Sequence, residues 1–495
     1  MNPQLLLDLQ KFYPELALTA AFLCVIVADI AFPRIRKRLT FAIAALGLAV
    51  AFFLSLPLIG EPAGTIFSGS LALDEMAVFF KCFLIATSLL VLLAAPGSKE
   101  LSQRHMGEFY MLLLGVTLSM LLLASSVDML MLYLSLEMVS IGSYVMVGYL
   151  KNDRQSNEAS LKYLLFGTVA TGAMLYGITI LYGLTGTTKI ALLREALATN
   201  IATGENAAML LIATALIVAG FGFKTAAVPF HFWCPDVYTG APTPVTAFLS
   251  VAPKAAGFAI LIRFFFTGFA ESGSPGSWTA FSFIDWRLLI IVISVVTMTF
   301  GNIAALRQNN IKRLLAYSSI AHAGYILMGT VVLNSQGLQS VLIYLITYLF
   351  MNLGAFLIVI EIFNRTGSFD IDDYRGLSRR SPFLTIAMTI FMLSLMGIPP
   401  FAGFFGKLYV FGAAVNNDLA WFAVVGALNS VISVYYYARV IRAMIIEPGR
   451  ETSLIPLPWT SHVMVWIMLL PTVGLMLFWN DIQQLTMSSL RLFLG

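Results

Sequence analysis

Apolar runs of about 20 residues recur along this chain, and each is long enough to cross the hydrocarbon core of a membrane as an α-helix. Backbone polar groups inside lipid must be satisfied within the segment, so such runs fold as helices. The expected fold is an all-α integral membrane protein, one polytopic domain over residues 1–495 with about 14 transmembrane helices. The spans are placed near 13–32, 39–60, 74–95, 108–124, 128–149, 158–184, 207–228, 243–268, 286–306, 312–334, 338–363, 383–413, 418–446 and 460–482.

The composition agrees with this class. Hydrophobic residues make up 59% of the chain and charged residues 11%, against about 25% charged in an average soluble domain. No basic tract indicates nucleic-acid binding, and the three cysteines are spaced for neither disulfides nor a metal site. No glycine-rich phosphate loop or dinucleotide fingerprint is present. We therefore expect no cofactor and no metal bound by the chain itself.

Basic residues are distributed unevenly between the two sides of the predicted membrane domain. Of the 29 Lys and Arg, 18 fall in the connections after odd-numbered spans, five fall on the other side and six fall within spans. Such residues are enriched in cytoplasmic connections. We therefore expect the odd-numbered connections in the cytoplasm and both termini on the outer, periplasmic side. A wrong span count would scramble this alternation, so charge supports the segmentation independently of hydropathy.

Two lysines lie in apolar runs that proline interrupts. Lys224 precedes Pro229 in the seventh span, and Lys407 follows Pro399 and Pro400 in the twelfth. A charged side chain near the bilayer centre costs about 2.5–3.5 kcal/mol on insertion scales, so a residue of this kind indicates a functional site by default. Proline removes a backbone donor and clashes with the preceding turn. We expect spans seven and twelve to be broken near their lysines.

The two interrupted spans run in opposite directions across the predicted membrane. Broken helices are tolerated at membrane depth only where protein buries them or where they line a watery cavity. Such a pair is typical of an inverted-repeat transporter whose site lies near the midplane. The alternative for either span is a proline kink with a lysine that extends to the membrane surface.

Glu137 and Lys254 are two more ionisable residues near the middle of predicted spans. A carboxylate at that depth needs a partner or a proton. Burial disfavours the charged form of lysine, whereas a nearby carboxylate favours it. A lysine whose partner approaches or recedes can therefore bind and release a proton near neutral pH. The alternative for Glu137 is a purely structural ion pair.

Three other residues are weaker candidates for a proton relay. Lys162 follows Glu158 by four residues, so an ordinary salt bridge along one helix explains it about as well as function does. His231 follows the break in the seventh span and could pass protons to the cytoplasmic side, although a satisfied loop histidine is an equal alternative. His322 lies in the tenth span beside Ser318, Ser319 and Tyr325, a polar stripe suited to water, and the alternative for it is a core histidine.

Two further charges, Lys81 and Arg263, fall within the third and eighth spans. Long basic side chains can bury their stems while the charged end reaches water. We therefore expect both side chains to extend toward the outer face of the membrane.

At these residues the chain resembles the antiporter-like membrane subunits of proton-pumping NADH:quinone oxidoreductase, respiratory complex I. We expect three features to distinguish it from the sister subunits M and L. They are Lys254 in span eight, Lys407 where subunit M usually has glutamate, and a segment after the last span that is too short for the long C-terminal helix of subunit L. The segments that carry the resemblance are LSLEMVSIGSYVMVGY, NEASLKYLLFG, GFKTAAVPFHFWCPDVYTGAPTPVTAFLSVAPKAAGF, GNIAALRQNNIKRLLAYSSIAHAGYILMG and SLMGIPPFAGFFGKLYVF.

The resemblance implies two inverted repeats of five helices, spans 4–8 (108–268) and spans 9–13 (286–446), each with a half-channel. Spans 1–3 lie within 1–107 and span 14 within 460–482. The family's functional positions match Glu137, Lys224, Lys254 and Lys407, and its less certain positions match Lys162, His231 and His322.

The family also implies a location and partners. The location is the bacterial inner membrane, and the partners are other membrane subunits of complex I, including the sister antiporter-like subunits. Flavin, iron–sulfur clusters, NADH and quinone belong to partner subunits. The chain would then be a membrane subunit of a translocase without redox chemistry of its own. Two alternatives stay open: a subunit of an Mrp-type sodium/proton antiporter, and a non-conducting structural subunit.

Overall fold

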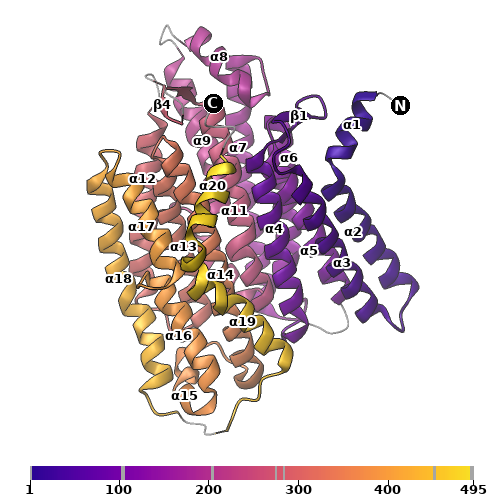
Figure 1. Cartoon of the computed structure of the whole chain (residues 1–495), viewed down its shortest axis with the longest axis vertical. Helices are drawn as coiled ribbons and strands as arrows, with labels where there is room; N and C mark the ends of the chain where they lie inside the picture. Colours follow the sequence, from indigo (N-terminus) through magenta and orange to yellow (C-terminus); the bar gives the residue numbers. More distant parts are fainter. Residues whose placement is uncertain are drawn as a thin grey trace.

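A computed structural model describes residues 3–101, 106–201, 206–273, 276–281, 285–449 and 453–490. Arg104, Arg450 and Arg491, which entered the charge count, lie outside these ranges. The described chain is a bundle of long helices with two short hairpins, β1–β2 and β3–β4, near one end (Figure 1). The strands are β1 (Gly64–Ile66), β2 (Leu71–Leu73), β3 (Ala270–Ser272) and β4 (Trp278–Ala280), each pair antiparallel.

Twelve helical segments of the described residues are long and apolar enough to cross a membrane, and they coincide with twelve of the predicted spans. They comprise α2 (Tyr13–Ala31), α3 (Arg36–Ser55), α4 (Glu75–Ala94), α5 (Met106–Ser125), α6 (Met129–Val147), α7 (Arg154–Thr185), α9 (Ala207–Thr225), α11 (Thr243–Gly268), α12 (Trp286–Ala305), α14 (Ser335–Thr366), α18 (Ala420–Ile445) and α19 (Trp459–Gly474) continued by α20 (Trp479–Ser488).

The two other predicted spans correspond to less apolar or shorter helices. The tenth is α13 (Ile311–Thr330), which carries basic residues, serines and a histidine. The twelfth is divided into α16 (Pro382–Met396) and α17 (Ala402–Val415). The remaining helices are α1 (Pro3–Lys11), α8 (Ile190–Ile201), α10 (Trp233–Gly240), α15 (Leu377–Arg380) and the 3₁₀ turns η1 (Leu56–Leu58), η2 (Ala95–Gly97), η3 (Ile371–Tyr374) and η4 (Leu475–Phe478).

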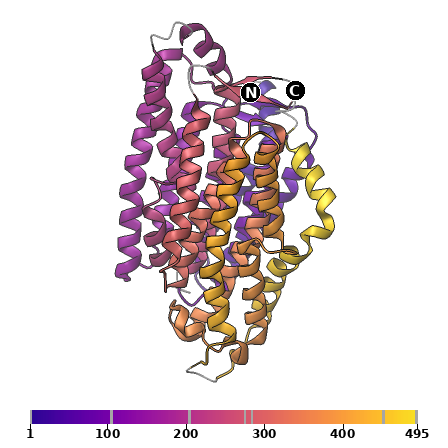
Figure 2. The same ribbon diagram turned by 90° about the vertical axis from the view of Figure 1, so that its left-hand side faces the viewer.

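The core lies around α11, of which every residue except Thr267 is buried. Helices α4, α5, α9 and α14 pack against it, whereas α2 and α3 form one edge of the bundle and α18 the opposite edge (Figure 1). The side view shows α19 and α20 running along the flank of the bundle (Figure 2). The described helices are thus arranged around one central helix.

Proline breaks two helices, as the sequence predicts. The first break separates α9 from α10, and Ala226 there has a positive φ of 58°. Side chains from outside α9 provide hydrogen bonds to the backbone groups at this break. The indole of Trp233 donates to the carbonyl of Phe223 at 3.1 Å, and the hydroxyl of Thr297 accepts from the N–H of Val228 at 2.9 Å. Such replacement partners allow broken helices inside a membrane domain.

The second break separates α16 from α17. Gly397 ends α16 with a φ of +84°, a left-handed conformation that glycine adopts without a steric cost. The N–H of Gly403 donates to the Ser394 hydroxyl at 3.0 Å, which ties the start of α17 to the end of α16.

The expectation that Lys81 and Arg263 extend to the outer face is wrong. Lys81 is 1% exposed and pairs with Glu15 of α2 at 2.7 Å. Arg263 is also 1% exposed and grips Asp74, the N-cap of α4, through two hydrogen bonds of 2.6 and 3.0 Å. A partner from another helix compensates each charge inside the protein, so neither side chain needs to reach water.

Candidate functional site

Lys224 lies in the last turn of α9, directly before the helix break. Its amine donates to the hydroxyl of Ser140 on α6 at 2.9 Å. Glu137, one turn earlier on α6 and partly exposed, acts on the amine electrostatically, but no described carboxylate lies within 4.0 Å of it. The amine is therefore held by a neutral oxygen, with a carboxylate nearby but not in contact.

Lys254 lies in α11 one residue after Pro253, and its amine points toward α13. It donates to the hydroxyl of Ser319 at 2.6 Å and to the carbonyl of Ser319 at 3.1 Å, and it lies 5.8 Å from the ring centroid of Tyr238. Gly257, one turn further along α11, packs on Lys224, since a Cβ there would lie 3.2 Å from Lys224 Cγ. One turn of α11 therefore carries Lys254, and the next turn packs against Lys224.

His322 lies in α13 between two tyrosines from other helices. Its Nδ1 is 2.8 Å from the hydroxyl of Tyr344 on α14, and its Nε2 is 3.2 Å from the hydroxyl of Tyr437 on α18. Tyr437 also bonds Ser318, whose neighbour Ser319 holds Lys254. The charges of both Lys254 and Lys407 act on the imidazole. His322 thus lies between two lysines in a network of hydroxyl groups.

Lys407 lies in α17 and reaches back across the break to α16. Its amine donates to the carbonyls of Met396 at 2.7 Å and Leu395 at 3.1 Å, and it lies 5.0 Å from the ring centroid of Tyr325. The last carbonyls of a helix lack intrahelical partners and carry partial negative charge, so a cation is favoured there. Gly397 allows this approach, because a Cβ at that position would lie 2.7 Å from Lys407 Cδ.

Within the part of the chain that the structure describes, three lysine amines are therefore buried without an ion-pair partner. Lys224, Lys254 and Lys407 are 1%, 3% and 4% exposed. Each bonds a hydroxyl or carbonyl oxygen, and no carboxylate of the described residues lies within 4.0 Å of any of them. An uncompensated buried charge is costly, and a lysine amine can exist in a charged or a neutral form. The chemistry that such an arrangement supports is proton binding and release.

Lys162 does not share the environment of the three buried amines, because it belongs to a cluster of ion pairs. Its amine bonds Asp236 at 2.7 Å and Glu158 at 2.8 Å, and Arg313 adds a third contact to Asp236 at 3.0 Å. These side chains are partly exposed. The ion pair with Glu158 that the spacing suggested is therefore present, within a larger cluster that joins α7, α10 and α13.

His231 lies in the break between α9 and α10, buried against Phe232 and Phe300 with ring centroids 4.5 and 4.6 Å away. Its Nδ1 is buried without a hydrogen-bond partner among the described residues. The structure therefore gives this histidine no hydroxyl network of the kind that surrounds His322.

The sequence analysis missed several polar groups of this site. Ser140, Tyr238, Tyr344 and Tyr437 come from four helices, and only the run of three tyrosines at 435–437 within an apolar segment gave a signal. It also missed Lys312, a fully buried lysine that bonds the carbonyl of Ala241 at 2.5 Å and lies 3.7 Å from Glu100.

No group of three or more His, Cys, Asp or Glu residues suited to a metal ion occurs among the described residues. The polar groups of the site are amines, hydroxyls, carbonyls, an imidazole and the carboxylate of Glu137.

The family comparison covers the helices that carry this site. Residues 125–433 match a family model described as NADH:quinone oxidoreductase/Mrp antiporter, transmembrane. This range includes α6 through most of α18 and therefore all four candidate proton-binding residues.

Whole-chain comparisons extend the match. A curated relative from Anaeromyxobacter, NADH-quinone oxidoreductase subunit N, is 46% identical, with 98% of this chain and 97% of the relative covered. A chain of respiratory complex I from Thermus thermophilus superimposes with a TM-score of 0.78 at 31% identity and covers 95% of this chain and 98% of its own.

A third comparison concerns the alternative of an Mrp-type antiporter subunit. A chain of the Mrp complex from Dietzia superimposes with a TM-score of 0.82, covering 98% of both chains, but at 20% identity it shows the fold alone. The matched range and the close relatives together settle the family. The chain belongs to the NADH:quinone oxidoreductase/Mrp antiporter family of membrane subunits.

Proposed function

We propose that this chain is a proton-translocating membrane subunit of NADH:quinone oxidoreductase, in which electron transfer in partner subunits drives protons through its buried polar groups. The observation that carries the proposal is the set of three buried lysine amines that have no ion-pair partner among the described residues, with His322 and its hydroxyl network between two of them. Structural charges elsewhere in the chain, at Lys81 and Arg263, do have buried carboxylate partners.

Each residue has a role in this proposal. Lys224 accepts a proton from the cytoplasmic side, and Glu137 sets its affinity by approaching or receding. Lys254 and His322 connect the two half-channels, with Ser319 and Tyr437 as the hydroxyl groups beside them. Lys407 delivers the proton to the outer side. Lys162 and His231 stay candidates for entry from the cytoplasm.

Small movements of the hydrogen-bonding partners of the amines would supply the free energy that such a proton cycle needs. Moving one charge against 100 mV costs about 2.3 kcal/mol. A hydrogen bond to a charged group contributes about 1.5–3 kcal/mol, so gain or loss of one such bond at an amine is of matching size. Closure of the gap between Glu137 and Lys224 would provide a contact of this kind.

We further propose that α13 and the divided α16–α17 also cross the membrane, which gives fourteen spans in two inverted repeats, α5–α11 and α12–α18. Matched lengths support this: α7 and α14 have 32 residues each, and α11 and α18 have 26 each. Matched helix ends support it too. Thr185 is the last residue of α7 and Thr366 is the last residue of α14, and each hydroxyl donates to the carbonyl four residues earlier and to the carbonyl two residues later.

The same proposal places α1 and α8 on the outer side, since both lie at one end of the bundle (Figure 1). The half-helices α9 and α17, which carry Lys224 and Lys407, also lie toward this end (Figure 1). Both lysines therefore occupy the outer side of their breaks, although one precedes its proline and the other follows it.

Partners and cofactors follow from the relatives. Those that are 41–46% identical over most of the chain are named as subunits of quinone oxidoreductases, whereas the Mrp chain shares only the fold, which favours complex I over the antiporter. Flavin, iron–sulfur clusters, NADH and quinone are assigned to partner subunits. Near Glu137, α6 exposes an apolar face suited to a neighbouring membrane subunit, formed by Leu130, Leu134, Met138, Ile141 and Val145.

Co-purification tests this assignment. An affinity-tagged chain, extracted in mild detergent from the cells that make it, is expected to bring down a multi-subunit assembly that contains flavin and oxidises NADH. Flavin absorbance and NADH oxidation are the readouts. Recovery of a flavin-free antiporter assembly instead would refute the assignment to complex I.

A further inference from the structure

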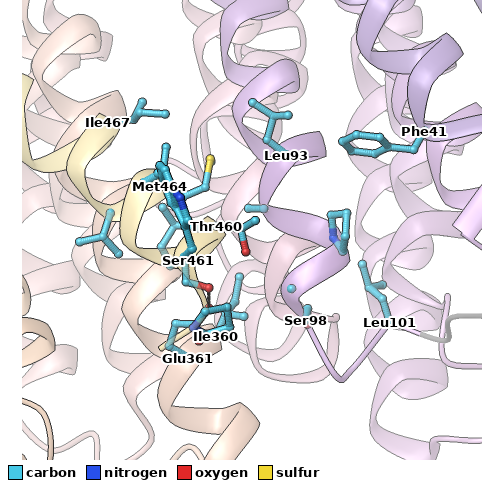
Figure 3. Close-up of a pocket in the computed structure, with 18 of the residues that line it drawn as sticks. Phe41, Leu93, Ser98, Leu101, Ile360, Glu361, Thr460, Ser461, Met464 and Ile467 are labelled. Carbon is cyan, nitrogen blue, oxygen red and sulfur yellow. Dashed lines mark hydrogen bonds between the residues drawn. The ribbon is translucent and has the colours of Figure 1, made fainter. Parts of the chain in front are cut away.

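A deep groove that takes no part in the proposed proton path opens between two groups of helices. Its volume is about 1070 Å³, just above the roughly 300–1,000 Å³ typical of ligand pockets. The starts of α3 and α5 and the end of α4 form one wall, and α14 and the start of α19 form the other (Figure 3). The start of α19, which lines the groove, lies toward the end of the bundle opposite α8 (Figure 1).

The walls of the groove are largely apolar. Phe41 and Leu93 line one side, and Met464 and Ile467 line the other (Figure 3). Leu93 and Ile467 are each 37% exposed, so the apolar surface is open rather than sealed inside the core. A surface of this kind at membrane depth accommodates hydrocarbon chains.

The mouth of the groove is basic on one side. Lys37 and Arg38, both exposed, lie in the first turn of α3 and line the groove beside Phe41. A helix N-terminus carries partial positive charge, which adds to that of the side chains. Trp459, 73% exposed at the start of α19, also lines the mouth, and tryptophan is enriched at the membrane–water interface.

Among the described residues that line the groove, the one carboxylate lies on the opposite wall. Glu361 of α14 accepts a hydrogen bond from the Ser461 hydroxyl at 2.6 Å, and both residues are separated from Phe41 of α3 across the groove (Figure 3). The carboxylate and the two basic residues therefore come from different walls, α14 and α3.

We propose that this groove binds an anionic phospholipid, with its acyl chains between α4 and α19 and its phosphate at Lys37 and Arg38. Charge complementarity selects this occupant, because basic residues at membrane level attract anionic headgroups and an apolar groove beside them takes the chains. A quinone has no anionic group for the basic mouth. The proposal rests on membrane embedding and is independent of the proton path.

Photolabelling of the whole assembly tests this site. The assembly is placed in phosphatidylcholine nanodiscs that contain a trace of phosphatidylglycerol with a photoreactive acyl chain, and labelled peptides are mapped by mass spectrometry. A photoreactive phosphatidylcholine serves as the matched probe. We expect phosphatidylglycerol to label residues 89–97 and 459–467 in preference to phosphatidylcholine.

The double variant Lys37→Gln/Arg38→Gln is expected to lower this preference about thirty-fold, since each basic residue near the surface contributes about five-fold. Arg34→Gln is the matched control, because Arg34 is exposed in the same connection but does not line the groove. In the native assembly, unlabelled phosphatidylglycerol should compete and phosphatidylcholine should not. Equal labelling by both lipids, a preference unchanged in the double variant, or displacement by a quinone analogue would each overturn the proposal.

Discussion

Replacing Lys224 by alanine is expected to depress NADH-driven proton pumping in the assembled complex about ten-fold or more. The amine lies 1% exposed beside the α9 break and bonds only a hydroxyl among the described residues, so a proton that passes α9 has no equivalent acceptor there. An added barrier of about 1.4 kcal/mol at this step already slows it ten-fold. Quenching of a pH-sensitive dye in inverted membrane vesicles measures the effect.

The control for this variant is Lys151→Ala, since Lys151 is exposed in the connection after α6. It should pump at the native rate. Flavin content of the vesicles establishes that both variants assemble. Undiminished pumping by an assembled Lys224→Ala complex would remove the role assigned to this lysine.

Replacing Arg263 by methionine is expected to destabilise the chain by about 3–5 kcal/mol, the typical cost of removing one partner of a buried ion pair. The guanidinium holds Asp74 through two hydrogen bonds, and both side chains are at most 2% exposed, so the substitution leaves a buried carboxylate uncompensated. The readouts are the thermal unfolding of the purified assembly and the amount of chain in the membrane.

Two comparison variants separate this effect from general damage. Arg263→Met/Asp74→Asn removes both charges and keeps an acceptor for the N–H of Ala77, so it should recover most of the lost stability. Lys11→Gln breaks an exposed contact of 3.9 Å to Glu61 and should cost at most about 1 kcal/mol. A single variant as stable as the native chain would contradict a structural role for the Arg263–Asp74 pair.

Much of the fold follows from local sequence. Twelve of the predicted spans coincide with long apolar helices, because run length and hydropathy act within one segment. Both helix breaks were also expected from proline in an apolar run, because proline removes a backbone donor and clashes with the preceding turn. Proline alone does not decide the outcome, since Pro253 lies within the continuous helix α11. The deep positions of Lys224, Lys254 and Lys407 were predictable for the same reason, whereas their proton-carrying roles stay proposals.

The partners of buried groups could not be predicted in this way. Lys81 and Glu15 are 66 residues apart, and Arg263 and Asp74 are 189 apart, so only helix packing brings them together. The same holds for His322 and Tyr437, 115 residues apart. A basic residue near a span end looks the same in sequence whether it reaches water or a buried carboxylate, which explains the wrong expectation for Lys81 and Arg263.

The number of protons translocated per NADH oxidised, measured on the assembled complex in proteoliposomes, tests most directly whether protons pass through this chain. Lys254→Met is the informative variant, because methionine fills the buried site on α11 without a group that binds protons, while Lys151→Met changes an exposed lysine in the same manner. We predict a lower ratio for Lys254→Met and the native ratio for Lys151→Met. A native ratio in an assembled Lys254→Met complex would show that the buried amines hold helices together without carrying protons.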